Sequence, residues 1–181
     1  IEIYYFISSI FLILIVSIPP FRSLSSISAS LKGYYYVNYI DLGFIKRGLI
    51  GTIFKLLRLS DNLTPSLLVL TSHLFFSILF CITFWIFAKS CFKDWKLKEK
   101  IPFYTLFTLS PVLFFRLGYD IGRMDLICLV FSLFTIILTL SNAYSFTKKC
   151  IFISISISIQ LLIHEASLFF YTPLIIGLLF Y

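Results

Sequence analysis

Long apolar runs separated by short polar connections constrain this chain more than any other feature of its sequence. The runs lie at about 3–18, 63–88, 101–117, 124–142, 150–165 and 166–181. A helix needs roughly 17 to 25 apolar residues to cross a bilayer, and a chain that is 60% hydrophobic and 13% charged can supply several such helices. We therefore expect an all-α, polytopic transmembrane helix bundle with about five crossings and a sixth begun.

The polar stretch at 19–62 is the longest connection between two of these runs. The chain opens on Ile1 without a methionine and stops at Tyr181 inside an apolar run. We therefore interpret residues 1–181 as a single transmembrane domain that is truncated at both ends. In this interpretation the 19–62 stretch is a long extracytoplasmic loop.

The charges of the short connections predict an orientation. The connection 93–100 and the pair Lys148–Lys149 are separated by two crossings and therefore share a side. Their density of lysine indicates the cytoplasm, because cytoplasmic loops are enriched in positive charge. Residues 19–62, 116–125 and 164–165 then lie together on the extracytoplasmic side.

Arginine and lysine are segregated between the two sides. The cations assigned to the cytoplasm are all lysine, whereas the outer side holds the arginines of the chain, which are Arg22, Arg47, Arg58, Arg116 and Arg123. A guanidinium fork binds phosphate or carboxylate through two donors, but an arginine can also reach toward lipid headgroups without a further role. Charge at the membrane is costly unless it is used, and the sequence leaves both roles open.

A lone carboxylate stands among aromatic residues in the long outer loop. Asp41 follows a tyrosine-rich stretch that begins at Tyr34, and tyrosine suits a membrane interface because its ring is apolar and its hydroxyl is polar. Such a carboxylate is desolvated unless it is used or is paired with Lys46 or Arg47. We expect either a catalytic or binding role for Asp41 or one of these pairings.

The pattern becomes that of an amphipathic helix over about 46–59. Arg47, Gly51, Lys55 and Arg58 recur on one face, at spacings of four, four and three residues. Most of the apolar residues lie on the other face, namely Leu49, Ile50, Ile53, Phe54 and Leu57. We expect this helix to lie flat in the outer interface, with Lys55 and Arg58 as solvated charges.

A second group of charges occupies the connection at 116–125. Its candidate binding residues are Arg116, Tyr119, Asp120, Arg123 and Asp125, and two glycines allow tight turns between them. Asp120 can pair with Arg116 or Arg123, which would close a capped turn before the next helix. Contact with a substrate is the alternative reading of the same residues.

His164 and Glu165 form the third group, adjacent to each other between two apolar runs. Burying both is costly, so we expect them to pair with the outer arginines or to bind a cation. No second histidine stands four residues on, as a zinc protease requires, and the cysteines lack CxxC spacing. The metal ligands are therefore unassigned, with a divalent cation as one candidate cofactor.

These features together resemble the GT-C superfamily of integral membrane glycosyltransferases. The resemblance is carried by Tyr39 to Gly51 with Asp41, by Tyr119 to Asp125, and by His164–Glu165. It lies in the layout, in which a first crossing precedes a long outer loop with an acidic residue and an interfacial helix. It implies a polyprenyl-phosphate sugar as donor and an acidic residue of that loop as base or metal contact, a role that falls on Asp41.

Glycosyl transfer from a lipid phosphate needs a carboxylate to accept a proton, cations to hold the departing phosphate, and a dry pocket. We therefore predict a glycosyltransferase in a bacterial plasma membrane, with its site on the extracytoplasmic side. Asp41 is the catalytic candidate. The substrate-binding candidates are Lys46, Arg47, Arg116, Tyr119, Asp120, Arg123, Asp125, His164 and Glu165. The expected partners are a lipid-linked sugar donor and membrane lipids, without nucleic acid, and no oligomeric state is indicated.

Other classes of membrane protein share part of this pattern. An envelope polysaccharide polymerase or ligase would use the same outer arginines on a lipid pyrophosphate and would move a whole glycan. A transporter or flippase would need charges along a path through the membrane, whereas the helix interiors around 67–87 and 126–140 carry no Asp, Glu, Lys or Arg. An accessory structural subunit would need no site at all.

Overall fold

The computed structural model describes residues 29–45, 47–108, 124–141, 143–165, 169 and 171–179. Regular structure in these ranges is helical throughout, which confirms the all-α prediction for this part of the chain. The helices are α2 (Ala29–Tyr34), α3 (Tyr39–Leu42), α4 (Gly48–Leu56), α5 (Leu59–Asn62), α6 (Pro65–Cys91), α7 (Leu97–Thr108), α9 (Asp125–Leu140), α10 (Phe146–Ile163) and α12 (Thr172–Leu179).

Two of these helices, α6 with 27 residues and α10 with 18, are long and apolar enough to cross a membrane. Helix α9 is apolar but shorter, with 16 residues. The predicted crossing at 101–117 overlaps α7, which has 12 residues and begins at Leu97, and the one at 166–181 contains α12, which has 8 residues. The predicted crossing at 3–18 lies outside the described residues. A bundle with five or six crossings therefore stays a prediction.

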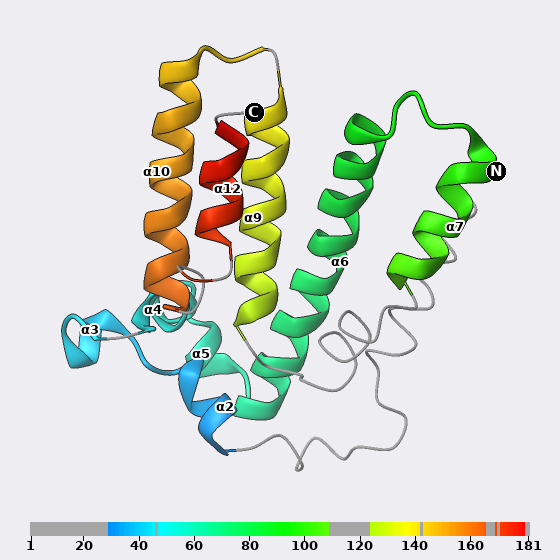
Figure 1. Ribbon diagram of the computed structural model, residues 1–181. Helices are drawn as coiled ribbons and strands as arrows, with labels where there is room; N and C mark the ends of the chain where they lie inside the picture. Colours follow the sequence, from blue (N-terminus) through cyan, green and yellow to red (C-terminus); the bar gives the residue numbers. More distant parts are fainter. Residues whose placement is uncertain are drawn as a thin grey trace.

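Helix α9 is central to the packing, because it contacts α6, α10 and α12 (Figure 1). Phe80 and Cys81 of α6 pack with Leu126 and Val130 of α9. A separate cluster joins Ile136, Ile153 and Ile175, one from each of α9, α10 and α12. The bundle core is thus built from the same apolar residues that identified the helices in the sequence.

Uncharged polar side chains also join α9 to α10 inside the bundle. The buried Gln160 donates through Nε2 to Ser156 Oγ at 3.1 Å and accepts from Ser132 Oγ at 3.0 Å. The hydroxyls of Ser156 and Thr135 bond to each other across the same interface. Polar groups that satisfy one another in this way act as specific contacts between membrane helices.

The two ends of the bundle differ in what they carry (Figure 1). One end, here called the loop end, holds helices α2 to α5 together with the start of α6 and α9 and the last turn of α10. The connection that carries residues 93–96 and the first turn of α10, which carries Lys148–Lys149, lie at the opposite, lysine end. The number of crossings predicted that the charged stretches of the loop end lie on one side and the lysine-rich stretches on the other, and this holds for the described residues. The assignment of the loop end to the outer side stays a prediction.

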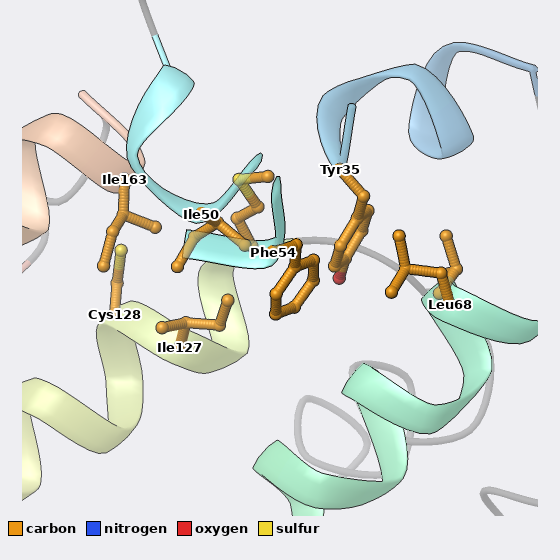
Figure 2. Close-up of a cluster of buried hydrophobic side chains, with 9 residues drawn as sticks. Tyr35, Ile50, Phe54, Leu68, Ile127, Cys128 and Ile163 are labelled. Carbon is orange, nitrogen blue, oxygen red and sulfur yellow. The ribbon is translucent and has the colours of Figure 1, made fainter. Parts of the chain in front are cut away.

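A buried cluster attaches the loop end to the bundle (Figure 2). Its residues are Tyr35, Ile50, Phe54, Leu68, Val69, Met124, Ile127, Cys128 and Ile163. The ring of Tyr35 stacks on that of Phe54, with centroids 5.8 Å apart. Helix α4 therefore directs Ile50 and Phe54 into protein, which differs from a helix that lies flat with its whole apolar face in the membrane.

The helix predicted over 46–59 is also interrupted. Helix α4 ends at Leu56, and α5 begins at Leu59 after Arg58 adopts a left-handed backbone conformation with φ of 56°. A non-glycine residue in this conformation cannot continue a right-handed helix. The amphipathic pattern runs on across this break, so the pattern alone did not reveal it.

Helix α3 and the residues that lead into it rest on α4 at two glycines. A Cβ atom at Gly51 would lie 2.0 Å from the carbonyl oxygen of Val37, and one at Gly48 would lie 2.4 Å from the ring of Tyr39. The backbone of Tyr39 also donates a hydrogen bond to Thr52 Oγ1 at 2.8 Å. The absence of side chains at the glycines thus permits the close approach that positions α3.

Candidate functional site

Asp41 lies on α3, where a buried amide holds its carboxylate. Asn38, the N-cap of α3, accepts a hydrogen bond from the backbone N–H of Asp41 and donates through Nδ2 to Asp41 Oδ2, both at 2.9 Å. The same Nδ2 donates to the carbonyl oxygen of Tyr36 at 3.0 Å. Asn38 was not among the residues predicted from the sequence, although an Asn three residues before an acidic residue is a signal for a helix cap of this kind.

Lys55 of α4 forms an ion pair with Asp41, and its ammonium contacts both carboxylate oxygens. Hydrogen bonds from Lys55 and, second, from Asn38 hold the pKa of Asp41 below its usual value of 3.8. The side chain of Asp41 is nevertheless 50% exposed. Asp41 is therefore an ionised carboxylate that other molecules can reach, and not a desolvated one.

This pairing differs from the two that the sequence suggested. Arg47 is engaged elsewhere, and Lys46 lies outside the described residues. Lys55, expected to be a solvated charge, is instead the partner of Asp41. The reason is the fold of the loop, because the contact of α3 with the glycines of α4 places Asp41 beside the last turn of α4.

Arg47 joins the start of α4 to the end of α10. Its Nε donates to Glu165 Oε2 at 3.0 Å and its Nη2 to Glu165 Oε1 at 2.7 Å. The guanidinium also lies 5.0 Å from the ring centroid of Tyr34, and the bonds to Glu165 hold the pKa of Arg47 above its usual value. Glu165 thus pairs with an outer arginine, one of the two alternatives expected for it.

His164 and Asp125 connect the ends of two bundle helices. His164 caps the C-terminus of α10, Asp125 is the first residue of α9, and their Nε2 and Oδ1 atoms are 3.6 Å apart. The acidic group of Asp125 at the N-terminus of α9 suits the helix dipole. Among the described residues, no cluster of three or more His, Cys, Asp or Glu side chains could hold a metal ion.

The structure therefore brings together at the loop end four charged residues and a histidine from stretches far apart in sequence. These residues are Asp41, Arg47, Asp125, His164 and Glu165. The other candidates, Lys46, Arg116, Tyr119, Asp120 and Arg123, lie outside the described residues. The two ion pairs of α4 are eight residues apart along the chain, about 12 Å at 1.5 Å per helical residue. They are thus two neighbouring features and not one cluster.

The Asp41–Lys55 pair and the Arg47–Glu165 pair differ in the chemistry that they offer. Asp41 presents an ionised, half-exposed carboxylate that can accept a proton or a hydrogen bond. Arg47 has two of its donors engaged by Glu165, so its role within the described residues is to orient the loop against α10.

Comparison with known proteins finds no matching protein family, curated protein or solved structure for this chain. The resemblance to GT-C enzymes therefore rests on the layout of the loop and on the charged residues. It stays a prediction.

Proposed function

We propose that this protein is a membrane glycosyltransferase that moves a sugar from a polyprenyl-phosphate donor to an acceptor at the loop end of the bundle. The observation that carries the proposal is the gathering of charged residues from three stretches at one end of an apolar helix bundle. A lipid-linked donor keeps its hydrocarbon chain in the bilayer and its phosphate and sugar at the surface. Its enzyme therefore needs polar groups where the helices end.

Asp41 is the proposed proton acceptor. Glycosyl transfer requires a base near the acceptor hydroxyl, and Asp41 is ionised and half exposed. Lys55 contacts both of its oxygens, but each carboxylate oxygen can accept a second hydrogen bond, so an acceptor hydroxyl can approach the exposed side of Asp41. Loss of the contact with Lys55 when the acceptor binds would raise the pKa of Asp41 and make the carboxylate a better base.

Arg116 and Arg123 are the proposed phosphate ligands, because Arg47 is already engaged by Glu165. Both lie outside the described residues, and their role rests on the sequence. Arg123→Lys keeps the charge but loses the two-donor fork, so it should weaken binding of the donor lipid. Arg58→Lys is the matched control, since Arg58 is an exposed arginine at the same end. Equal donor affinity for Arg123→Lys and wild type would contradict this role.

The transfer itself is tested with the full-length protein in lipid nanodiscs. The donor is a polyprenyl-phosphate hexose with a radiolabelled sugar, offered with envelope lipid extract as the source of acceptors. Asp41→Asn should lower the transfer rate roughly a hundredfold or more, because the amide cannot take a proton. Asp61→Asn is the control, since Asp61 is an exposed carboxylate on α5. A near-normal rate for Asp41→Asn would leave that residue with a structural role only.

The proposed side of the membrane has its own test. In a background without the exposed Cys91, Asn62→Cys should react with an impermeant thiol reagent in intact cells, and Lys96→Cys should not. Asn62 is exposed at the loop end and Lys96 at the lysine end. Reversed labelling would place the proposed site in the cytoplasm.

A further inference from the structure

Large apolar side chains in α3, in α4 and directly after each of them point away from the protein. Five of them are more than half exposed and are here called the apolar edge: Ile40 at 55%, Leu42 at 57%, Phe44 at 87%, Leu56 at 69% and Leu57 at 62%. They are separate from the apolar residues of α4 that the protein buries. Single exposed apolar residues are ordinary, but so many within one short loop indicate a surface that binds something apolar.

The contacts of α4 with α10 and α6, the two helices that are able to span a membrane, indicate how deep the apolar edge lies in the bilayer. Ile163 in the last turn of α10 belongs to the same buried cluster as Ile50 of α4 (Figure 2). Leu161, about 3 Å earlier along α10 at 1.5 Å per residue, is exposed on the outside of the bundle. Helix α4 therefore lies at a depth in the bilayer where the exposed surface of α10 is still apolar.

Helix α6 gives the same depth independently. Leu68 in its first turns belongs to the cluster that contains Phe54 of α4, and the neighbouring Leu67 is exposed. With 27 residues, α6 is about 40 Å long, which exceeds the roughly 30 Å of bilayer hydrocarbon. Both helices that are able to span thus present apolar side chains to the outside at the level of α4.

The charges beside the apolar edge suit the boundary of a membrane. Lys55 and Arg58 flank Leu56 and Leu57 in sequence, and Asp41 lies between Ile40 and Leu42. Long cationic side chains can lay their stems along hydrocarbon and keep their charged heads at the headgroups. Apolar side chains interleaved with such charges are typical of segments that lie in the interface of a bilayer.

We propose that the apolar edge inserts into the acyl chains of the leaflet at the loop end, and that the Asp41–Lys55 pair consequently lies at the level of the lipid phosphates. The proposal concerns the contact between protein and lipid, and it holds whether or not the protein transfers sugars. If it does transfer sugars, this insertion sets the height at which a lipid phosphate meets Asp41.

The test uses tryptophan fluorescence of the full-length protein in phosphatidylcholine and phosphatidylglycerol bilayers. The chain has two tryptophans, so Trp85→Phe and Trp95→Phe give a silent background. Phe44→Trp and Leu57→Trp each report on the edge, and Asn62→Trp, at an exposed polar position of α5, is the matched control.

Phosphatidylcholine brominated on its acyl chains should quench Phe44→Trp and Leu57→Trp by about half or more, as expected for side chains roughly 5 to 10 Å into the headgroup and acyl boundary. Aqueous iodide should quench Asn62→Trp and leave the two edge reporters nearly unchanged. If one edge variant fails to fold, the other decides, because Phe44 follows α3 and Leu57 follows α4.

Two results would overturn the insertion. Quenching of the edge reporters by iodide to the same extent as Asn62→Trp would show that the edge faces water. Protection from both iodide and brominated lipid would show that another protein, or a second copy of this one, covers it. Neither measurement depends on sugar transfer, so failure of the transfer assay would not affect this result.

Discussion

Replacing Gly51 by alanine tests the close packing that positions Asp41. The added Cβ would lie 2.0 Å from the carbonyl oxygen of Val37 and 3.2 Å from that of Tyr35. Both obstacles are backbone atoms, which cannot turn aside as a side chain can. Val37 must therefore move by about 1.4 Å, the difference between 2.0 Å and the 3.4 Å at which ordinary contact begins.

The expected loss of stability in Gly51→Ala is the difference between two opposing effects. Forcing an extra carbon into a packed site costs typically about 1–3 kcal/mol, and displaced backbone favours the upper part of that range. Alanine in a helix gains about 1 kcal/mol over glycine, so the net loss should be about 1–2 kcal/mol. For a chain of this size each kcal/mol corresponds to roughly 2–4 °C in Tm.

Gly177→Ala is the matched control. Gly177 lies within α12, and a Cβ atom there would have nothing within 4 Å. Thermal unfolding of the detergent-solubilised protein should show a lower Tm for Gly51→Ala and an unchanged or higher Tm for Gly177→Ala. Because Val37 immediately precedes the N-cap of α3, the Gly51 variant should also lose transfer activity. A Tm for Gly51→Ala at or above that of wild type would refute the close contact between α3 and α4.

Three further substitutions test other contacts. Asn38→Ala removes one of the hydrogen bonds that lower the pKa of Asp41. Because a base loses activity as the pH falls through its pKa, and the variant raises that pKa, the acid limb of the pH–rate profile should move to higher pH. An unmoved limb would argue against Asn38 as a positioning residue. Arg47→Lys loses the fork on Glu165 and should cost about 1 kcal/mol for a partly exposed pair, seen as a lower Tm, while an unchanged Tm would mean that the pair adds nothing. Gln160→Leu removes one hydrogen bond each from Ser132 and Ser156, which keep Cys128 O and Thr135 as partners, and should cost about 1 kcal/mol, with equal stability of variant and wild type as the contrary outcome.

The helices could be predicted from the sequence because their apolar runs are long and uninterrupted. The run at 63–88 became α6, which begins at Pro65, a residue suited to the first turn of a helix. The runs at 124–142 and 150–165 became α9 and α10, with boundaries shifted by up to four residues. Counting crossings then placed the charged groups at a common end, because each crossing helix reverses the side of the chain.

The partners of the charged residues could not be predicted in the same way. Asp41 pairs with Lys55, although Lys46 and Arg47 are nearer in sequence. The choice depends on where α3 rests on α4, which in turn depends on a contact between Gly51 and the backbone of Val37. A contact of this kind leaves no periodic pattern. The role of Asn38, by contrast, follows from a short capping pattern that is visible in the sequence.

Photocrosslinking with a polyprenyl phosphate that carries a diazirine next to its phosphate tests most directly whether the loop end binds a lipid phosphate. The probe is incorporated with the full-length protein into nanodiscs, and the crosslinked peptides are mapped by mass spectrometry. Crosslinks should fall in residues 34–58, 116–125 and around 164–165, and an excess of unlabelled polyprenyl phosphate should compete them away. Crosslinks confined to the lysine end around 93–100 and 148–149, or spread over the bundle without competition, would contradict a phosphate site at the loop end.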